Sequence, residues 1–265
     1  MAANDDLIAT RVIVSCDASP LGATAIDAAA ALARGLDAEL KGIFVEDINL
    51  FRTAALPFTR EVASLTALAS RMHPGKLQRL LEGQAQSVRE VLAQAAAACG
   101  LQWSFQVVRG VPLGSVLDAM SGLDLAVFGH GGRFSATSTT APAPRIVVPA
   151  QGVVMVVFDG TAAAQRALGA AEALVRSLRG RLVVALTGAA GGTLRLREQT
   201  RERLEQQHAH ALFVNLKQRD AVAVGQAAET YAPAVLLWGG VEGDADRATF
   251  ATLVDALRCP VVLVA

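Results

Sequence analysis

Two stretches of the chain combine a short, nearly continuous apolar run with an aspartate directly after it, Asp17 in the first and Asp159 in the second. Neither run alternates apolar and polar positions, which is typical of a strand in a parallel sheet that is covered on both faces. A small hydroxyl residue follows each aspartate, Ser19 or Thr161, and has the side chain that caps a helix start. The alanine-rich segments that come next are therefore predicted to be helices, with each aspartate at the carboxyl end of a strand.

The two stretches begin copies of one longer pattern. The apolar segments 40–45 and 182–187 lie the same number of residues after Asp17 and Asp159. A chance resemblance rarely keeps its spacing through a whole strand–helix–strand unit, so the chain is predicted to contain an internal duplication.

Each copy is predicted to be one α/β domain: half one covers residues 9–150 and half two residues 152–265. Apolar runs of strand length alternate with longer segments of helical periodicity, which predicts a doubly wound parallel sheet in both halves. Gly35 and Gly100 are expected to end the first two helices. The expected helices cover residues 21–34, 77–99, 113–120, 162–178, 194–210, 219–231 and 246–257. The further expected strands cover residues 38–45, 103–108, 123–128, 145–148, 181–187, 212–216, 234–238 and 260–264.

Half one differs from half two in two places. It contains an insertion, residues 47–75, that is too apolar for a solvated loop and is expected to cover the cleft or to form a subunit contact. After its glycine turn at Gly129 it has too few residues for the last helix of half two. A Ser/Thr/Pro-rich loop, residues 135–144, is expected in place of that helix.

Composition narrows the classes of partner. The chain has 265 residues, of which 52% are hydrophobic, and its 24 Lys and Arg residues balance 24 Asp and Glu residues. A zero net charge gives no electrostatic reason to expect nucleic acid as a general partner. No apolar run reaches the length of a membrane helix, and the N-terminus lacks the apolar core of a secretory signal. The three cysteines are widely spaced and resemble small buried hydrophobes, so a cytoplasmic location is expected.

Several motifs together resemble one family. They are V-x-x-D-x-S at Val14–Ser19, F-D-G-T at Phe158–Thr161, A-E-L-x-x-x-x-V at Ala38–Val45, C-P-V-V-L-V at Cys259–Val264, and a glycine turn after the fourth strand. In order and spacing the chain resembles the universal stress protein family, in tandem, over nearly its whole length. The resemblance implies an adenine-nucleotide α-hydrolase-like sheet with strand order 3-2-1-4-5 in each half, and an intramolecular pseudo-dimer. It also implies that the last strands, 145–148 and 260–264, pair as antiparallel edges, since an unpaired apolar edge is a liability.

The resemblance also implies a nucleotide site at the switch point of half one. Nucleotide-binding members of the family carry an Asp after strand 1, a Val on strand 2 and a G-x2-G-x9-G-[ST] loop after strand 4, whose amides hold phosphates. Asp17 and Val45 match the first two features and would hold the adenosine. Arg133 would add a positive charge beside the phosphates. The residues of the glycine turn that would supply the amides are Gly129, His130, Gly131 and Gly132.

The match to the nucleotide motif is partial. Pro142 and Ala143 stand where the motif has Gly and then Ser or Thr, and proline lacks an amide donor. Half two departs further, because Thr187 replaces the valine and acidic residues surround the displaced glycines at Gly240 and Gly243. The resemblance therefore implies an incomplete phosphate site in half one and a mainly structural half two.

Other interpretations of these residues stay open. Asp17 and Asp159 can be turn or helix-capping aspartates without a ligand, and the glycine turn can be a plain turn. The histidines lack partners at ligand spacing, so no metal site is expected. No nucleophile–base pair or carboxylate pair is recognisable, and we expect no enzyme.

We expect a cytoplasmic regulatory or sensory protein that binds AMP, ADP or ATP weakly in half one. The protein partner is not identified by the sequence, and a homo-oligomer is one of the assemblies considered. The alternative is a protein-interaction module that binds no nucleotide. A slow ATPase is a third interpretation, disfavoured by the missing Gly-Ser of the motif.

Overall fold

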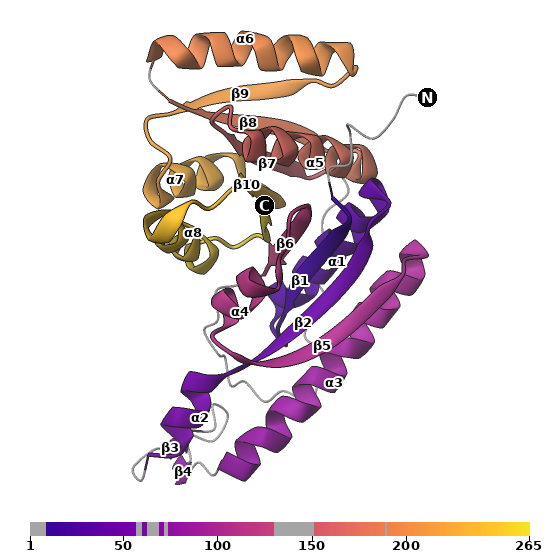
Figure 1. The fold of residues 1–265 in the computed structure, drawn as a ribbon, viewed down its shortest axis with the longest axis vertical. Helices are drawn as coiled ribbons and strands as arrows, with labels where there is room; N and C mark the ends of the chain where they lie inside the picture. The colour runs from indigo at the N-terminus through magenta and orange to yellow at the C-terminus, as the bar shows by residue number, and fades with distance from the viewer. Residues whose placement is uncertain (1–8, 57–59, 63–68, 72–73, 130–150, 189) are drawn as a thin grey trace.

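The computed structural model describes residues 9–56, 60–62, 69–71, 74–129, 151–188 and 190–265, which form one nine-stranded sheet with helices on both faces (Figure 1). The elements of half one are β1 (Arg11–Cys16), α1 (Pro20–Leu36), β2 (Glu39–Asp47), α2 (Ile48–Ala54), β3 (Arg60–Val62), β4 (Ala69–Arg71), α3 (Pro74–Cys99), β5 (Trp103–Gly110), α4 (Pro112–Ala119) and β6 (Asp124–Phe128). The elements of half two are β7 (Val153–Phe158), α5 (Ala162–Leu178), β8 (Arg181–Thr187), α6 (Ala190–Gln206), β9 (Ala211–Leu216), α7 (Ala221–Tyr231), β10 (Val235–Gly239), α8 (Gly243–Ala256) and β11 (Val261–Val264).

The sheet has the strand order β5-β2-β1-β6-β11-β10-β7-β8-β9. Half two therefore shows the full order 3-2-1-4-5, and half one shows its first four members, 3-2-1-4. All neighbouring pairs in this sheet are parallel except β11 with β6. The predicted α/β class, with doubly wound parallel sheets joined in one chain, is confirmed.

The junction between the halves differs from the prediction. Val261 of β11 pairs with Leu236 of β10 on one side and with Phe128 of β6 on the other. Both edges of β11 are thus occupied, and the predicted pairing of residues 145–148 with 260–264 is wrong. Residues 145–148 lie outside the described residues. The strand of half two takes the place next to β6 that a fifth strand of half one was expected to take.

Apolar side chains on the two faces of the sheet form two cores. Val12, Val14 and Leu40 point to the face covered by α1, α3, α5 and α6. Ile13 and Ile43 point to the opposite face, which α4, α7 and α8 cover (Figure 1). Strands buried on both faces explain why the apolar runs in the sequence do not alternate.

The first helices of the two halves, α1 and α5, pack against each other. Gly35 was expected to end the first helix, but α1 continues through it to Leu36, and that prediction is wrong. A Cβ atom on Gly35 would lie 3.3 Å from the carbonyl oxygen of Ala173 on α5, so this glycine serves helix contact. The helix ends instead at Asp37, whose φ of 53° is left-handed, and α5 ends in the same way at Arg179.

Two other helix ends test the glycine rule. Gly100, with a φ of 67°, ends α3 as predicted. The predicted helix 194–210 begins and ends too late, since α6 covers Ala190–Gln206. His208 takes a left-handed φ of 53°, and the amide of Ala209 donates to Leu204 O at 2.8 Å. The chain therefore leaves the helix without a glycine, which the sequence pattern did not reveal.

The described part of the insertion packs beside α3. Helix α2 follows β2 directly and contacts α3, and the antiparallel pair β3–β4 lies beyond it at the first turns of α3 (Figure 1). Arg109 fixes this arrangement, because its guanidinium carbon lies 4.2 Å from the centre of the Phe51 ring and its Nη2 2.7 Å from Oε2 of the buried Glu46.

No helix in the described part of the chain combines the length and the apolar character needed to cross a membrane.

Candidate functional site

Three residues predicted for the site lie at the carboxyl ends of neighbouring strands. Cys16 pairs with Phe44, and Ser15 pairs with Phe128, so β1, β2 and β6 end side by side. Asp17 directly follows β1, Gly129 directly follows β6, and Val45 lies near the end of β2. The prediction that Asp17 lies beside Gly129 is confirmed. The carboxyl ends of β1 and β6 form the topological switch point, where ligands bind in open α/β sheets.

Asp17 organises the start of α1. Its Oδ1 accepts the amide proton of Ser19 at 2.7 Å, and Ser19 Oγ accepts the amide proton of Gly22 at 2.9 Å as the helix cap. A Cβ atom on Gly22 would overlap the Asp17 carboxylate. Asp17 thus stabilises a turn, the role considered as the alternative to ligand binding. This turn lies at the switch point itself.

Gly129 allows β6 to end against the helix start. A Cβ atom at this position would lie 2.6 Å from Leu21 O and 2.9 Å from the amide nitrogen of Gly22. Only a residue without a side chain permits such contact with backbone. Gly239 repeats the arrangement in half two, where a Cβ atom would lie 2.5 Å from the amide nitrogen of Ala164 on α5.

Val45 lies on the face of the sheet that α4 covers and packs, partly buried, against the apolar core of that face. His130, Gly131, Gly132 and Arg133, the other predicted site residues, lie outside the described residues, as do Pro142 and Ala143.

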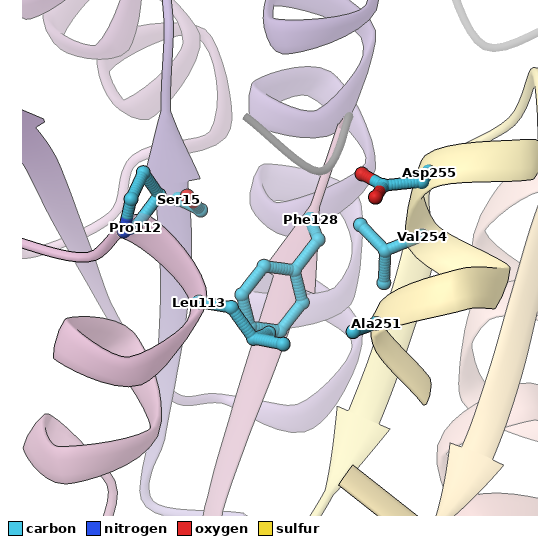
Figure 2. Close-up of a pocket in the computed structure, with 7 residues that line it drawn as sticks. All are labelled: Ser15, Pro112, Leu113, Phe128, Ala251, Val254 and Asp255. Carbon is cyan, nitrogen blue, oxygen red and sulfur yellow. The ribbon is translucent and has the colours of Figure 1, made fainter. Parts of the chain in front are cut away.

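A cavity of about 50 Å³ opens beside these strand ends (Figure 2). Ser15 on β1 and Phe128 on β6 form its floor, Pro112 and Leu113 at the start of α4 form one wall, and Ala251, Val254 and Asp255 on α8 form the other. Sites for drug-sized ligands have volumes of roughly 300–1,000 Å³. This cavity therefore has room for part of a small molecule, and a nucleotide would have to extend beyond it.

Half two supplies one wall of this cavity, which sequence reasoning missed. Helix α8 packs over β6 because β11 pairs with β6, and the rings of Phe128 and Phe250 meet edge to face with centroids 5.5 Å apart. Asp255 is the one acidic residue among the described lining residues, and none of these is cationic. The described part of the insertion contributes no lining residue, so its predicted cover over the cleft is not found there.

In half two, the corresponding crevice lies at the ends of β7 and β10, and the side chain of Arg219 occupies it. Asp159 repeats the turn of Asp17, with its Oδ1 accepting from the amide of Thr161 at 3.0 Å. Arg219, in the loop between β9 and α7, places its Nε 3.5 Å from Asp159 Oδ2 and its Nη1 3.5 Å from Asp246 Oδ2. Its Nη2 donates to the carbonyl oxygen of Gly239 and, at 3.1 Å, to that of Gly240.

The guanidinium of Arg219 also stacks on an aromatic ring. Its carbon lies 4.2 Å from the ring centre of Trp238, which occupies the place in β10 that Phe128 occupies in β6. The loop before α4 in half one supplies no such arginine at the matching place, since its residues directly before α4 are Gly110 and Val111. One feature of the sequence could have indicated this contact. Arg219 directly precedes the N-cap of α7, so it follows a strand at the same end of the sheet as Asp159.

Neither of the two buried cysteines, Cys16 and Cys259, supplies a reactive thiol. Burial raises the pKa of the Cys16 thiol far above its ordinary value, and the nearby Asp17 charge adds to the shift. Burial likewise raises the pKa of Cys259 to about 12. Both are therefore neutral and poor nucleophiles near pH 7. Within the described residues, no group of three or more His, Cys, Asp and Glu side chains is placed to hold a metal ion.

Solved structures share this fold. A universal stress protein from Archaeoglobus fulgidus matches with a TM-score of 0.59 and 12% identity, covering 97% of this chain and 97% of its own. A functionally unknown protein from Pseudomonas aeruginosa matches with a TM-score of 0.50 and 12% identity, covering 98% of this chain and 94% of its own. A scan against protein-family models and a search of curated proteins found no match. The likeness at this identity is one of fold: the chain has the fold of a universal stress protein along nearly its whole length.

Proposed function

We propose that the protein is a universal-stress-type regulatory or sensory protein of the cytoplasm that binds an adenine nucleotide weakly in half one. The proposal is supported by one observation above all: Asp17, Val45 and Gly129 meet at the switch point, beside the cavity between α4 and α8. A carboxylate can accept from ribose hydroxyl groups, and a backbone group at Val45 can meet an adenine edge. The protein is proposed to act by binding and not by catalysis.

The charges near the cavity favour ligands with few phosphates. Asp17 and Asp255 are both acidic, and no cationic side chain lines the cavity within the described residues. The sequence has Pro142 and Ala143 where the family's loop has Gly and Ser. Each further phosphate would be desolvated without a full set of donors, so AMP and ADP should bind no worse than ATP. Arg133 would offset part of this cost by pairing with one phosphate.

Calorimetric titration of AMP, ADP and ATP into the wild type and Asp17→Ala tests the proposal. We expect AMP binding with a dissociation constant on the order of 1 mM, which corresponds to about 4 kcal/mol, and a clear loss in Asp17→Ala. Because Asp17 also supports the start of α1, Asp159→Ala serves as the matched control for a lost turn aspartate. Tight ATP binding with AMP ignored would show that another part of the chain forms the phosphate site.

The second candidate is an interaction module that binds no nucleotide. It is favoured by the small volume of the cavity and by the turn role that Asp17 already performs. Absence of binding by all three nucleotides at millimolar concentration would select this candidate.

A further inference from the structure

We propose that the crevice of half two is a guanidinium-binding site whose resident ligand is Arg219. The inference concerns the crevice that Arg219 occupies and does not depend on nucleotide binding in half one. It would make Arg219 the residue that closes this crevice to free ligands.

The groups around Arg219 are those that recognise a guanidinium. Every neighbour of its nitrogens is an oxygen acceptor: the carboxylates of Asp159 and Asp246, and the carbonyls of Gly239 and Gly240. These acceptors come from the ends of β7 and β10 and from the first turn of α8, three elements that meet only in the folded chain. Planar guanidinium nitrogens match such separated acceptors, whereas an ammonium is a single point charge.

The aromatic floor of this crevice suits a cation. Trp238 is fully buried, and its Nε1 has no hydrogen-bond partner within the described part of the chain. A buried indole N–H without a partner is unfavourable, and the Phe128 of half one avoids that problem at the same position. A tryptophan face gives a stronger cation–π contact than a phenylalanine face, which is the gain that the larger ring brings under Arg219.

The charge balance selects cations over anions. Two carboxylates face one guanidinium, so the cluster is net negative even when Arg219 is in place, and Glu242 and Asp244 follow close by in the sequence. The side chains of Arg219, Asp159 and Asp246 are only 22%, 19% and 33% exposed, so their pairing is less screened than that of a surface pair. Without Arg219, both carboxylates would lose this cationic partner, and a phosphate would be repelled.

Chemical rescue of Arg219→Ala tests the site directly. The variant is made with Trp103→Phe, so that Trp238 is the single tryptophan and its fluorescence reports on the crevice. We expect a lower melting temperature for Arg219→Ala than for the Trp103→Phe parent. Methylguanidinium chloride at 0–20 mM should change the fluorescence saturably, with a millimolar dissociation constant. At ten times that constant it should favour the folded state by roughly tenfold.

Matched measurements separate the site from general effects. The parent, whose crevice is occupied, should show no saturable response. The same holds for Arg201→Ala, which removes an exposed arginine paired with Glu205 on α6. Methylammonium and sodium chloride at equal ionic strength should rescue Arg219→Ala less well, because they lack the planar fork. A linear response to methylguanidinium in Arg219→Ala, or one equal to that of the parent, would overturn the proposal.

A variant that fails to fold also decides the question. If Arg219→Ala is unfolded alone, methylguanidinium must restore a cooperative unfolding transition by mass action, and failure to do so contradicts the site. Adding Asp159→Asn to Arg219→Ala should weaken the methylguanidinium response at least fivefold, since one of the two carboxylates becomes neutral.

Discussion

The two switch-point crevices of this chain share their backbone and differ in what fills them. In both, an aspartate turn follows the first strand of the half, and a glycine at the end of the fourth strand lies against the start of the first helix. In half one a cavity remains beside Phe128, whereas in half two Arg219 lies on Trp238. The repeated fold thus sets where a ligand could bind, and in half two the side chain of Arg219, from the loop before α7, occupies that place.

The largest effects on stability are expected at the glycines by which both halves bring a strand end against a helix start. Gly129→Ala and Gly239→Ala each force a Cβ atom against backbone that cannot move independently of its helix. We expect each to lower the free energy of unfolding by about 3 kcal/mol, measured by urea denaturation. A Cβ atom on Gly83 or Gly225 meets nothing within 4 Å, so alanine at these helical positions should be neutral or stabilising. Equal stability of all four variants would refute the close-approach argument.

An intermediate effect is expected at Asp159. Its replacement by alanine removes one of the two carboxylates that hold Arg219, and we expect a loss of about 1–2 kcal/mol in the free energy of unfolding. Adenine-nucleotide affinity should stay unchanged, because the proposed site lies in half one. Calorimetry and denaturation on the same preparation measure both quantities. Lost nucleotide binding with Asp17 intact would reverse the assignment of the two halves.

The smallest effect, a change in nucleotide affinity, is expected on the wall of the cavity that α8 of half two forms. Asp255→Asn removes a negative charge from the opening of the cavity. We expect ATP affinity to rise by roughly twofold to fivefold, AMP affinity by less, and adenosine affinity not at all, because the screened repulsion grows with ligand charge. Asp244→Asn, at the other end of α8, is the matched control. A uniform change for the three ligands would show that Asp255 acts through shape and not through charge.

Local pattern was sufficient to predict much of this architecture. The apolar runs, the aspartates after them and the equal spacing of the halves predicted the strands, the helices and the duplication. The strand order of half two and the meeting of Asp17 with Gly129 were implied by the family resemblance. The strands and helices depend on neighbouring residues, so periodicity and spacing predict them, whereas the order of strands in a sheet does not follow from local pattern.

The failures concern choices between distant segments. Residues 145–148 and 260–264 are both short apolar runs, and nothing in their composition specifies which of them pairs with β6. Gly35 has the residue type of a helix end, yet its place in the α1–α5 contact decides its role. The partners of Arg219 likewise lie far away in sequence, so the closed crevice of half two follows only from the folded chain.

The pairing of β11 with β6 sets an order of events during synthesis. Translation delivers Phe128 long before Val261, the residue that pairs with it, so β6 must wait for all of half two before this edge is closed. Until then a nascent chain carries β6 without this neighbour, and every residue of β6 after Asp124 is apolar. Such non-local closure is slow, and open strand edges attract other chains. Ribosome-bound chains that stop before Val261 should therefore depend on chaperones that shield the β6 edge.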